Sequence, residues 1–453
     1  MTEEDVIVAV ATPPGVGALA LIRLSGPGAR DVAGRVLKPA AGKSAPWKAR
    51  FVRRVVAVDA AGAEIDDGIV VCYDAPRSFT GEDVVEFTGH GGVLVVQRVM
   101  EAFEAAGARA AGPGEFSQRA FLNGRMDLTE AEGIMDLIQA RTDLALRAAR
   151  RQMHGALREE VEALRAAAVK LTAHYEAWLD FPEEGIDPDT GRAMRARMIE
   201  LAVGIASLLE TAARGRILRD GLRLVIAGAP NAGKSSILNC LLGFERAIVS
   251  PEEGTTRDTV EEMLNLGGVP VRLIDTAGLR QADQGIERMG IERTQAAMTD
   301  ADLVLEVVDG TRPPQSVRRV DAEPEKCLLV INKADLPSHP GWDEAEADCE
   351  ACRVSCVTRH GLDALVARLR DTVVPGLSSW EDNPVAINSR HQRELERAAT
   401  ALRAAIDLFD GGGEPELVAE ELRETLDAIG TVGGRVDAEE ILGAIFGTFC
   451  IGK

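Results

Sequence analysis

The sequence has few cysteines, no long hydrophobic run and no excess of basic residues. Seven cysteines in 453 residues favour reduced thiols over a disulfide framework. No apolar run approaches the roughly 18 residues of a membrane-spanning helix. The first residues, MTEEDVIVAV, are acidic where a signal peptide would be basic. We therefore expect a cytoplasmic protein.

The charge balance limits the partners that the chain can bind. Acidic residues outnumber basic ones by 72 to 51, which gives a formal net charge of -21. This balance repels nucleic-acid backbones unless lysines and arginines gather locally. Any contact with nucleic acid should therefore be local or shared with a partner. The chain is still 46% hydrophobic, so it can bury sizeable cores, and its length suggests about two to four domains.

Short apolar runs separated by glycine and proline turns occupy the first part of the chain. Runs such as IVAVAT, ALALIRLSG, RFVRRVVAV and GIVVCYDA predict strands, whereas GARDVAGRVL and VLVVQRVMEAFEAAG predict helices. We expect an α+β domain over residues 1–119.

The middle and the end of the chain have a helical pattern. Thr129 and Glu132 have the spacing of a capping box, and an Ala/Leu/Arg/Glu-rich stretch follows to about Trp178. Helical sequence resumes after FPEEGIDPDTG and again after Val385. We expect one all-α domain built from two parts, residues 120–220 and 377–453.

Residues 221–376 lie between these helical parts. Buried-strand runs (LRLVIAG, VRLID, DLVLEVVD and CLLVIN) are each followed by a turn and a helical stretch, as in a doubly wound parallel sheet. The predicted fold class is therefore multidomain: an α+β N-terminal domain, a discontinuous helical domain and an inserted α/β domain with a phosphate-binding loop.

The segment GAPNAGKS, residues 228–235, follows a predicted strand and precedes a predicted helix, as a phosphate-binding loop requires. Backbone N–H groups of such a loop wrap the phosphates, Lys234 would neutralise them, and the Ser235 hydroxyl would ligate Mg²⁺. A short pattern can match by chance, so the motifs that follow it decide the prediction. The predicted contacts of this loop are Asn231, Ala232, Gly233, Lys234, Ser235 and Ser236.

Further motifs follow in the order expected of a GTPase. GTTRD (254–258) supplies a switch threonine, Thr256, to Mg²⁺, and DTAG (275–278) senses the γ-phosphate. NKAD (332–335) carries a carboxylate that accepts two hydrogen bonds from guanine, a donor pair that adenine lacks. SCVT follows where GTPases usually carry Ser-Ala, so a cysteine replaces the alanine. These motifs predict further nucleotide contacts at Ser250, Thr255, Thr256, Asp275, Thr276, Ala277, Gly278, Asn332, Lys333, Asp335, Ser355 and Cys356.

The residue after DTAG is Leu279, which cannot orient the attacking water as a glutamine does. Catalysis must therefore use other groups, such as the Glu287 carboxylate and a monovalent cation that replaces an arginine finger. Glu287 is otherwise an ordinary solvated acid at a helix start. Asn231 is either a turn residue or a potassium ligand.

Motifs outside the nucleotide segment make the resemblance specific. ATPPGVGALALIRLSG, SFTGEDVVEFTGHGG, GPGEFSQRAFLNGRMDLTEAE and the terminal FCIGK resemble the MnmE (TrmE) family of tRNA modification GTPases, and the resemblance extends over the whole chain. It implies a folate-binding N-terminal domain that forms a homodimer, a discontinuous helical domain and an inserted GTPase domain.

The resemblance also implies an activity. With MnmG, an FAD- and NADH-dependent partner with which it forms a heterotetramer, the family adds an aminomethyl or carboxymethylaminomethyl group at C5 of the wobble uridine in certain tRNAs. The one-carbon unit comes from a tetrahydrofolate derivative, 5,10-methylene- or 5-formyl-tetrahydrofolate. Potassium-dependent pairing of two GTPase domains stimulates GTP hydrolysis, which drives the conformational changes that modification needs.

Several residues match the family's functional positions. Glu287 falls at the catalytic glutamate. This chain reads SPEE before GTT, where the family usually reads Thr-Asp-Ile-Ala, and the difference affects the geometry of the predicted potassium loop. The resemblance implies potassium ligands at Asn231, Ser250, Glu252 and Thr255 and folate contacts at Arg23, Glu82, Arg125 and Lys453.

Arg125 replaces the lysine expected at that folate position, and a planar guanidinium is not equivalent to an ammonium. Each of the four folate candidates is, taken alone, an ordinary surface charge.

The cysteines offer two further interpretations. Cys349, Cys352, Cys356 and His360 have a spacing that suggests zinc, but Cys356 lies in the guanine-contact motif and no second ligand pair accompanies them. Cys450 matches the family's C-terminal cysteine and has either a chemical or a packing role.

Two other classes of function compete with the modification enzyme. A ribosome-assembly GTPase similar to Era would carry a basic RNA-binding domain after the GTPase domain, whereas this chain ends in acidic helices. A pure nucleotide switch would need GTP loading but not hydrolysis for its output.

Overall fold

The computed structural model describes residues 5–40, 47–180, 192–244, 262–274, 301–314, 326–345, 351–373, 385–434 and 452. The chain forms two compact units, Met1–Ala131 with Gly430–Lys453, and Glu132–Ile429. Among the described residues, none of the helices combines the length and the hydropathy of a transmembrane span.

The first unit is an α+β fold around one sheet. Its strands pair in the order β3-β4-β5-β6-β2-β1-β7, and the β1–β7 pair is parallel while the others are antiparallel. The strands are β1 (Ile7–Val10), β2 (Leu19–Ser25), β3 (Leu37–Pro39), β4 (Arg53–Val58), β5 (Glu64–Tyr73), β6 (Val84–His90) and β7 (Arg109–Ala110). The helices are α1 (Ala29–Val36), α2 (Val93–Ala105) and α3 (Glu115–Leu122).

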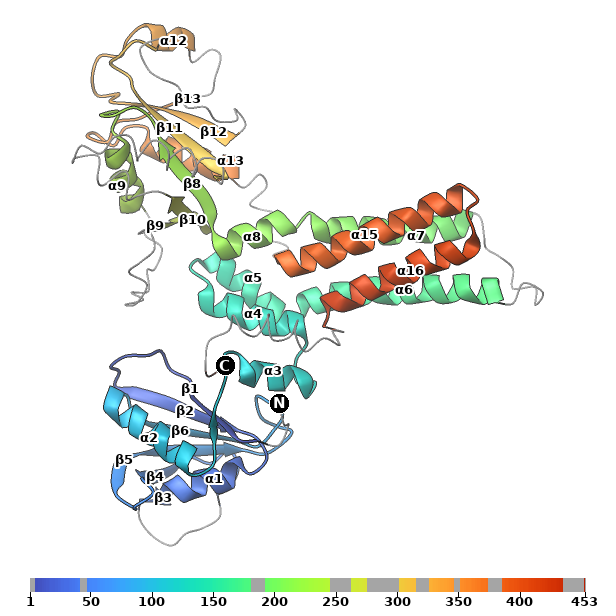
Figure 1. The fold of residues 1–453 in the computed structure, drawn as a ribbon. Coiled ribbons are helices and arrows are strands. Elements are labelled where there is room, and N and C mark those ends of the chain that lie inside the picture. The colour runs from blue at the N-terminus through green and yellow to red at the C-terminus, as the bar shows by residue number, and fades with distance from the viewer. Residues whose placement is uncertain are drawn as a thin grey trace. The chain divides into compact units, whose positions relative to one another are not determined.

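The two faces of this sheet differ in how well they are covered. Ile22 and Leu24 of β2 point with Phe87 toward α1 and α2, and they form a buried core with Phe103 of α2. Figure 1 shows both helices on that side of the sheet. Successive side chains of a strand alternate between faces, so the same strands place other apolar residues on the opposite face. That face stays partly open, and Leu19 and Ile69 are 63% and 43% exposed.

Helix α4 (Leu128–Gln139) begins differently from the sequence prediction. Asp127 Oδ1 accepts the Glu130 N–H and the Thr129 hydroxyl, both at 2.8 Å. Glu130 Oε2 accepts the Asp127 N–H at 2.8 Å in return. The capping box is therefore Asp127 with Glu130, and the predicted pairing of Thr129 with Glu132 was wrong. Glu132 is buried and pairs with other groups.

The second unit contains a bundle of long helices drawn from both sides of the nucleotide segment. Met198, Leu201, Ile205 and Leu208 form the buried stripe of α7, which packs beside α15 and α6. Figure 1 shows α6, α7, α15 and α16 side by side. The helices are α5 (Asp143–Met153), α6 (Ala156–Asp180), α7 (Arg192–Leu209), α8 (Ala212–Asp220), α15 (Ser389–Asp410) and α16 (Pro415–Val432).

The nucleotide lobe of this unit is a sheet in the order β13-β12-β11-β8-β10-β9, parallel except for β9. Every residue of β11 is buried, as expected of a central parallel strand that is covered on both faces. The strands are β8 (Leu222–Ala227), β9 (Glu262–Leu266), β10 (Val269–Ile274), β11 (Leu303–Asp309), β12 (Cys327–Asn332) and β13 (Ala351–Arg353). The helices are α9 (Lys234–Phe244), α12 (Gly341–Ala345) and α13 (Leu362–Val373).

The nucleotide lobe is docked against the helices that precede it. Leu144 and Ala145 of α5 and Leu218 of α8 belong to the same buried cluster as the strands of the lobe. The chain enters the lobe at Gly221, which has a φ of 81°. On its return it packs tightly on α8, because a Cβ atom at Gly215 would lie 2.1 Å from the carbonyl oxygen of Ile387. The predicted fold class is thus confirmed, with the α/β lobe inserted between helical segments.

Candidate nucleotide-binding site

The loop between β8 and α9 has a backbone that requires glycine. Gly228 and Gly233 have φ values of 140° and 97°. A Cβ atom at Gly228 would lie 2.1 Å from the Val307 carbonyl oxygen, and one at Gly233 would lie 2.0 Å from Asn332 Nδ2. Asn231 also adopts a left-handed conformation, with a φ of 65°, which asparagine tolerates better than most residues. The loop therefore passes directly over β11 and the end of β12.

Lys234 closes this loop on itself. Its Nζ atom donates to the carbonyl oxygens of Gly228 and Ala229, each at 3.0 Å. Burial lowers the pKa of Lys234, and a nearby phosphate would favour the charged form again. Lys234 also begins α9, whose N-terminal N–H groups and dipole favour an anion. A partly buried ammonium at a helix start fits a phosphate group, and Ser235 would hold the accompanying Mg²⁺.

The NKAD segment connects the phosphate loop to the base-reading side. Asn332 is buried, and its Nδ2 atom donates to the Ala232 carbonyl oxygen at 2.9 Å. Asp335 Oδ1 accepts the Ser355 hydroxyl at 2.6 Å, and the Ser355 N–H donates to the His360 carbonyl oxygen at 2.9 Å. These contacts hold an exposed carboxylate in one orientation, as recognition of a base edge requires.

Cys356 packs inside this arrangement. Its Sγ atom lies 3.7 Å from Asn332 Oδ1, and Cys240 Sγ lies 3.9 Å from the Cys356 carbonyl oxygen. Burial and the neighbouring Cys240 thiol raise the pKa of Cys356 to about 12, so the thiol stays protonated at neutral pH. Among the described residues, Cys352, Cys356 and His360 do not form a group with metal-ligand spacing. Cys349 lies outside the described residues.

The first unit brings together several of the predicted folate residues. Arg23 of β2 forms an ion pair with Glu86 of β6, with an Nε to Oε1 distance of 2.9 Å. The Arg23 guanidinium also lies over the rings of Phe79 and Phe116, at 5.3 and 5.8 Å from the ring centroids. Phe79 belongs to the segment that also carries Glu82, so Arg23 and Glu82 border the same part of the unit.

Glu82 is held by buried polar groups. Its Oε2 atom accepts the Ser25 hydroxyl at 2.7 Å, and Arg119 Nη1 lies 3.3 Å from both carboxylate oxygens. Ser25 Oγ is also 2.6 Å from Thr80 Oγ1. The arrangement leaves Glu82 partly exposed, and an oriented carboxylate fits the N–H groups of a pterin ring.

Arg125 lies beside the segment that carries Glu82, and Gly452 lies against the end of β1. A Cβ atom at Gly81 would lie 3.1 Å from Arg125 Cγ, so the arginine stem covers the residue before Glu82. Gly452 is buried, and a Cβ atom there would lie 2.4 Å from the Val10 carbonyl oxygen at the end of β1. Lys453, the fourth folate candidate, lies outside the described residues.

Comparisons with known proteins cover nearly all of the chain. Residues 6–125 match the model described as "GTP-binding protein TrmE N-terminus", and residues 128–450 match the "MnmE helical domain". The tRNA modification GTPase MnmE of Akkermansia muciniphila is 45% identical over 453 residues, which cover 99% of each chain. The chain belongs to the MnmE family. MnmE of Thermus thermophilus is 42% identical over 457 residues and the whole of both chains.

A solved structure resembles the nucleotide lobe only weakly. The G domain of the T. maritima FeoB iron transporter aligns with 34% of this chain and 99% of its own length. Its sequence identity of 24% and TM-score of 0.25 are too low to support an argument about this member of the MnmE family.

Many of the candidate residues drawn from the MnmE resemblance fall in segments that the structure does not describe. Their roles stay predictions. The described nucleotide candidates lie at the carboxyl ends of the parallel strands, in the loops that follow or in the first turn of α9; they are Asn231 to Ser236, Asn332, Lys333, Asp335, Ser355 and Cys356. Outside the described residues lie Ser250, Glu252, Thr255, Thr256, Asp275, Thr276, Ala277, Gly278, Glu287, Cys450 and Lys453.

Sequence reasoning missed Asp309 at the end of β11. Its Oδ2 atom lies 2.6 Å from Lys333 Nζ, and its Oδ1 atom accepts the N–H and hydroxyl of Thr311 at 3.0 and 2.7 Å. Burial alone would raise the pKa of Asp309, but Lys333 and Thr311 hold it below its usual value. An acid that ends a buried strand is rarely left without a partner, so the sequence could have marked Asp309 as paired but could not have named Lys333.

Proposed function

We propose that this chain is a GTP hydrolase that acts in the modification of tRNA. Membership of a family whose curated relatives are named tRNA modification GTPase MnmE gives the reaction and the substrate class. The structural observation that supports it best is the 2.9 Å hydrogen bond from Asn332 Nδ2 to the Ala232 carbonyl oxygen. It makes the phosphate loop and the base-reading segment one rigid site.

The residues of this site have separate tasks in the proposal. Lys234 exchanges its two carbonyl partners for the β- and γ-phosphates, and Ser235 with Thr256 holds Mg²⁺. Asp335 accepts two hydrogen bonds from guanine while Ser355 keeps its carboxylate in place. Glu287 orients the attacking water. Of these residues, Thr256 and Glu287 lie outside the part of the chain that the structure describes.

The finer parts of the proposal come from the family resemblance. Potassium, held by Asn231, Ser250, Glu252 and Thr255, would stabilise the transition-state charge that an arginine finger stabilises in other GTPases. A tetrahydrofolate derivative would bind near Arg23, Glu82, Arg125 and Lys453, and MnmG would supply the flavin chemistry. The exposed Asn231 amide at the tip of the loop and the oriented Glu82 carboxylate support these assignments.

A homodimer through the first unit is also part of the proposal. Leu19 and Ile69 are exposed on the open face of the first unit's sheet, which also carries partly exposed Leu21 and Val71. Exposed apolar residues on an uncovered sheet face are a feature of protein–protein interfaces. The proposed domain boundaries remain 1–119, 120–220, 221–376 and 377–453.

The function can be tested in cells and with the purified protein. Mass spectrometry of tRNA nucleosides from cells without this chain should show wobble uridines that lack the C5 substituent, and re-expression should restore it. If cells without this chain carry the C5 substituent at the wild-type level, the role in tRNA modification is contradicted. Purified protein should release phosphate from GTP faster in potassium chloride than in sodium chloride at equal ionic strength, and equal rates would overturn the potassium assignment alone.

A further inference from the structure

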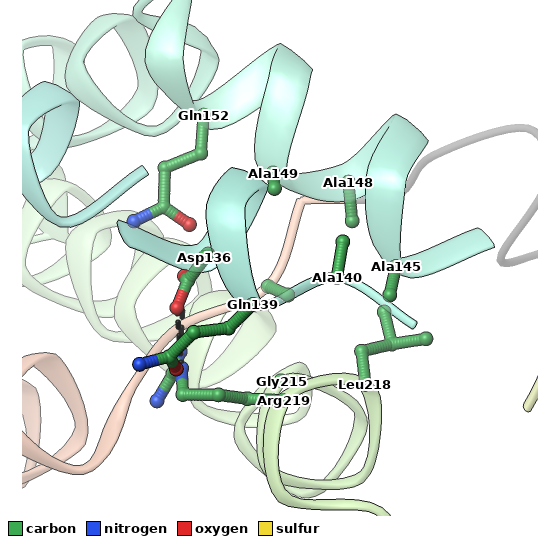
Figure 2. Close-up of a pocket in the computed structure, with 11 residues that line it drawn as sticks. Asp136, Gln139, Ala140, Ala145, Ala148, Ala149, Gln152, Gly215, Leu218 and Arg219 are labelled. Carbon is green, nitrogen blue, oxygen red and sulfur yellow. Dashed lines mark hydrogen bonds and ion pairs between the residues drawn. The ribbon is translucent and has the colours of Figure 1, made fainter. Parts of the chain in front are cut away.

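Helix α8 makes ion pairs toward both the helices and the nucleotide lobe. Toward the helices, Arg219 Nε lies 2.8 Å from Asp136 Oδ1 of α4, and Figure 2 shows this pair at the wall of a small cavity. Toward the lobe, Arg216 forms a bidentate pair with Asp302, with distances of 2.7 Å from Nη2 to Oδ1 and 3.1 Å from Nη1 to Oδ2. The two arginines are three residues apart, so a single turn of helix connects α4 to the lobe.

Asp302 connects Arg216 to two strands of the lobe. It directly precedes β11, the buried central strand, and its Oδ2 atom also accepts the Arg223 N–H of β8 at 2.9 Å. The other end of β11 is Asp309, which holds Lys333 in the base-reading segment. A displacement of β11 on nucleotide binding or hydrolysis would therefore reach Arg216 through Asp302.

The segment by which the chain leaves the lobe, residues 385–390, contacts α8 and is also held by helix α4. Gly215 of α8 contacts Ile387 too closely to permit sliding. Two residues after Asn388, Arg390 Nε lies 2.9 Å from Glu132 Oε1. Glu132 and Asp136 are one turn apart on α4, so adjacent acids on this helix hold both connections of the lobe.

The packing beneath α8 leaves room for a shift. The cavity in Figure 2 has a volume of about 20 Å³ and is lined mainly by small side chains, which include Ala140, Ala145, Ala148, Ala149 and Ala386. Close-packed interiors resist displacement, whereas alanines around a cavity of this size offer few contacts to break. The ion pairs therefore add directional contacts to the apolar packing of Leu218 in the core of the lobe.

We infer that α8 couples the nucleotide lobe to the helices, with Arg216 and Arg219 as positioning residues that act through Asp302 and Asp136. The inference rests on the proposed function, because its output is tRNA modification. Removing either arginine should leave nucleotide binding intact and disconnect hydrolysis from modification.

The test compares Arg216→Gln with Arg195→Gln in the full chain. Arg195 forms an equivalent pair with Asp410, at 2.8 Å from Nε to Oδ1, but joins α7 to α15 away from the lobe. Coupling between two sites typically changes a binding affinity by about 5- to 150-fold. On that scale we expect Arg216→Gln to reduce wobble-uridine modification about fivefold or more, with the Kd for a fluorescent GTP analogue and the rate of GTP hydrolysis within about twofold of wild type.

A double variant separates coupling from loss of structure. Because both arginines act through one helix, Arg216→Gln with Arg219→Gln should reduce modification no more than the stronger single variant, whereas independent effects would multiply. Modification by Arg216→Gln equal to that of Arg195→Gln would overturn the inference, as would loss of GTP-analogue binding. If the wild type itself modifies no tRNA, the proposed function fails first.

Discussion

At the scale of single residues, Asp335 shows how a side chain is prepared for recognition before a ligand arrives. Its carboxylate is exposed, but the Ser355 hydroxyl fixes Oδ1 at 2.6 Å. Asp335 Oδ2 and the second lone pair of Oδ1 remain free to accept hydrogen bonds from the guanine edge. Orientation by a neighbour lowers the entropy that binding would otherwise cost.

Asp335→Asn should change the base that the site selects. The amide oxygen can keep the Ser355 contact, and the amide N–H₂ then faces the base, where it matches the 2-oxo group of xanthine and repels the donors of guanine. Hydrogen bonds to a charged group contribute about 1.5 to 3 kcal/mol each. The Kd for GTP should therefore rise roughly 100-fold or more, while the Kd for XTP falls.

Isothermal titration calorimetry with GTP and XTP would measure both constants. Asp343→Asn is the matched control, because Asp343 lies in the same lobe and pairs with Arg353 at 2.6 Å without contact to the base-reading segment. An unchanged GTP to XTP preference in Asp335→Asn would mean that the base is read elsewhere.

At the scale of elements, the start of α15 is held by a buried acid. Glu132 Oε2 lies 2.6 Å from His391 Nε2, and His391 Nδ1 accepts the Asn388 N–H at 3.2 Å as part of a capping box. The proton of the ring therefore sits on Nε2 and the imidazole is neutral. Burial, although opposed by Glu132, holds the pKa of His391 below its usual 6.5. Burial would raise the pKa of Glu132, but His391 and Arg390 hold it below its usual range.

Both shifts have the same consequence for stability. A group whose pKa is lower in the folded state loses its contribution as the pH falls below its unfolded value. For His391 that loss starts near pH 6.5, whereas the Glu132 contribution is lost only at more acidic pH, below its usual 4.5. The His391 contribution to the free energy of unfolding should therefore be smaller at pH 5.5 than at pH 7.5.

Urea unfolding followed by circular dichroism at both pH values would measure this change. His391→Gln should flatten the dependence on pH relative to wild type, and the comparison removes the contributions of the other histidines. His154→Gln, at the exposed C-terminus of α5, should leave the dependence as it is. Equal slopes for wild type and His391→Gln would show that His391 takes up a proton without cost in the folded state.

Elements with a strong local pattern were predictable, and those set by distant contacts were not. The strand, loop and helix around Lys234 follow from the order of apolar, glycine and polar residues. The runs that predict strands in the first unit do not include β6, whose residues belong to the motif SFTGEDVVEFTGHGG. The capping box was misplaced because both Asp127 and Thr129 are good caps and only packing of Glu132 against α15 decides between them.

The candidate site shows the same division. Phosphate and base contacts follow from short motifs whose spacing reflects local geometry. By contrast, Asp309 binds Lys333 across neighbouring strands. Arg119 contacts both Glu82 and Asp5, and Asp5 is 114 residues away from Arg119 in the sequence. Such pairs depend on the tertiary fold, so no local pattern predicts them.

At the scale of the whole molecule, the proposed homodimer can be tested on the open face of the first unit's sheet. Ile69→Glu places a charge among exposed apolar residues, and burying an unpaired carboxylate in an interface is unfavourable. Light scattering after size-exclusion chromatography should show a smaller mass for this variant than for wild type. Ile199→Glu, on an exposed position of α7, should not change the mass. A dimer that survives Ile69→Glu would place the interface elsewhere.

The two contacts of Lys234 with its own loop have a kinetic consequence. Lys234 Nζ donates to the carbonyl oxygens of Gly228 and Ala229, in the loop that would wrap the phosphates. Nucleotide entry would then exchange these two partners for phosphate oxygens within the loop. The association rate should be set by diffusion and charge, and selectivity should come from how slowly the correct nucleotide leaves.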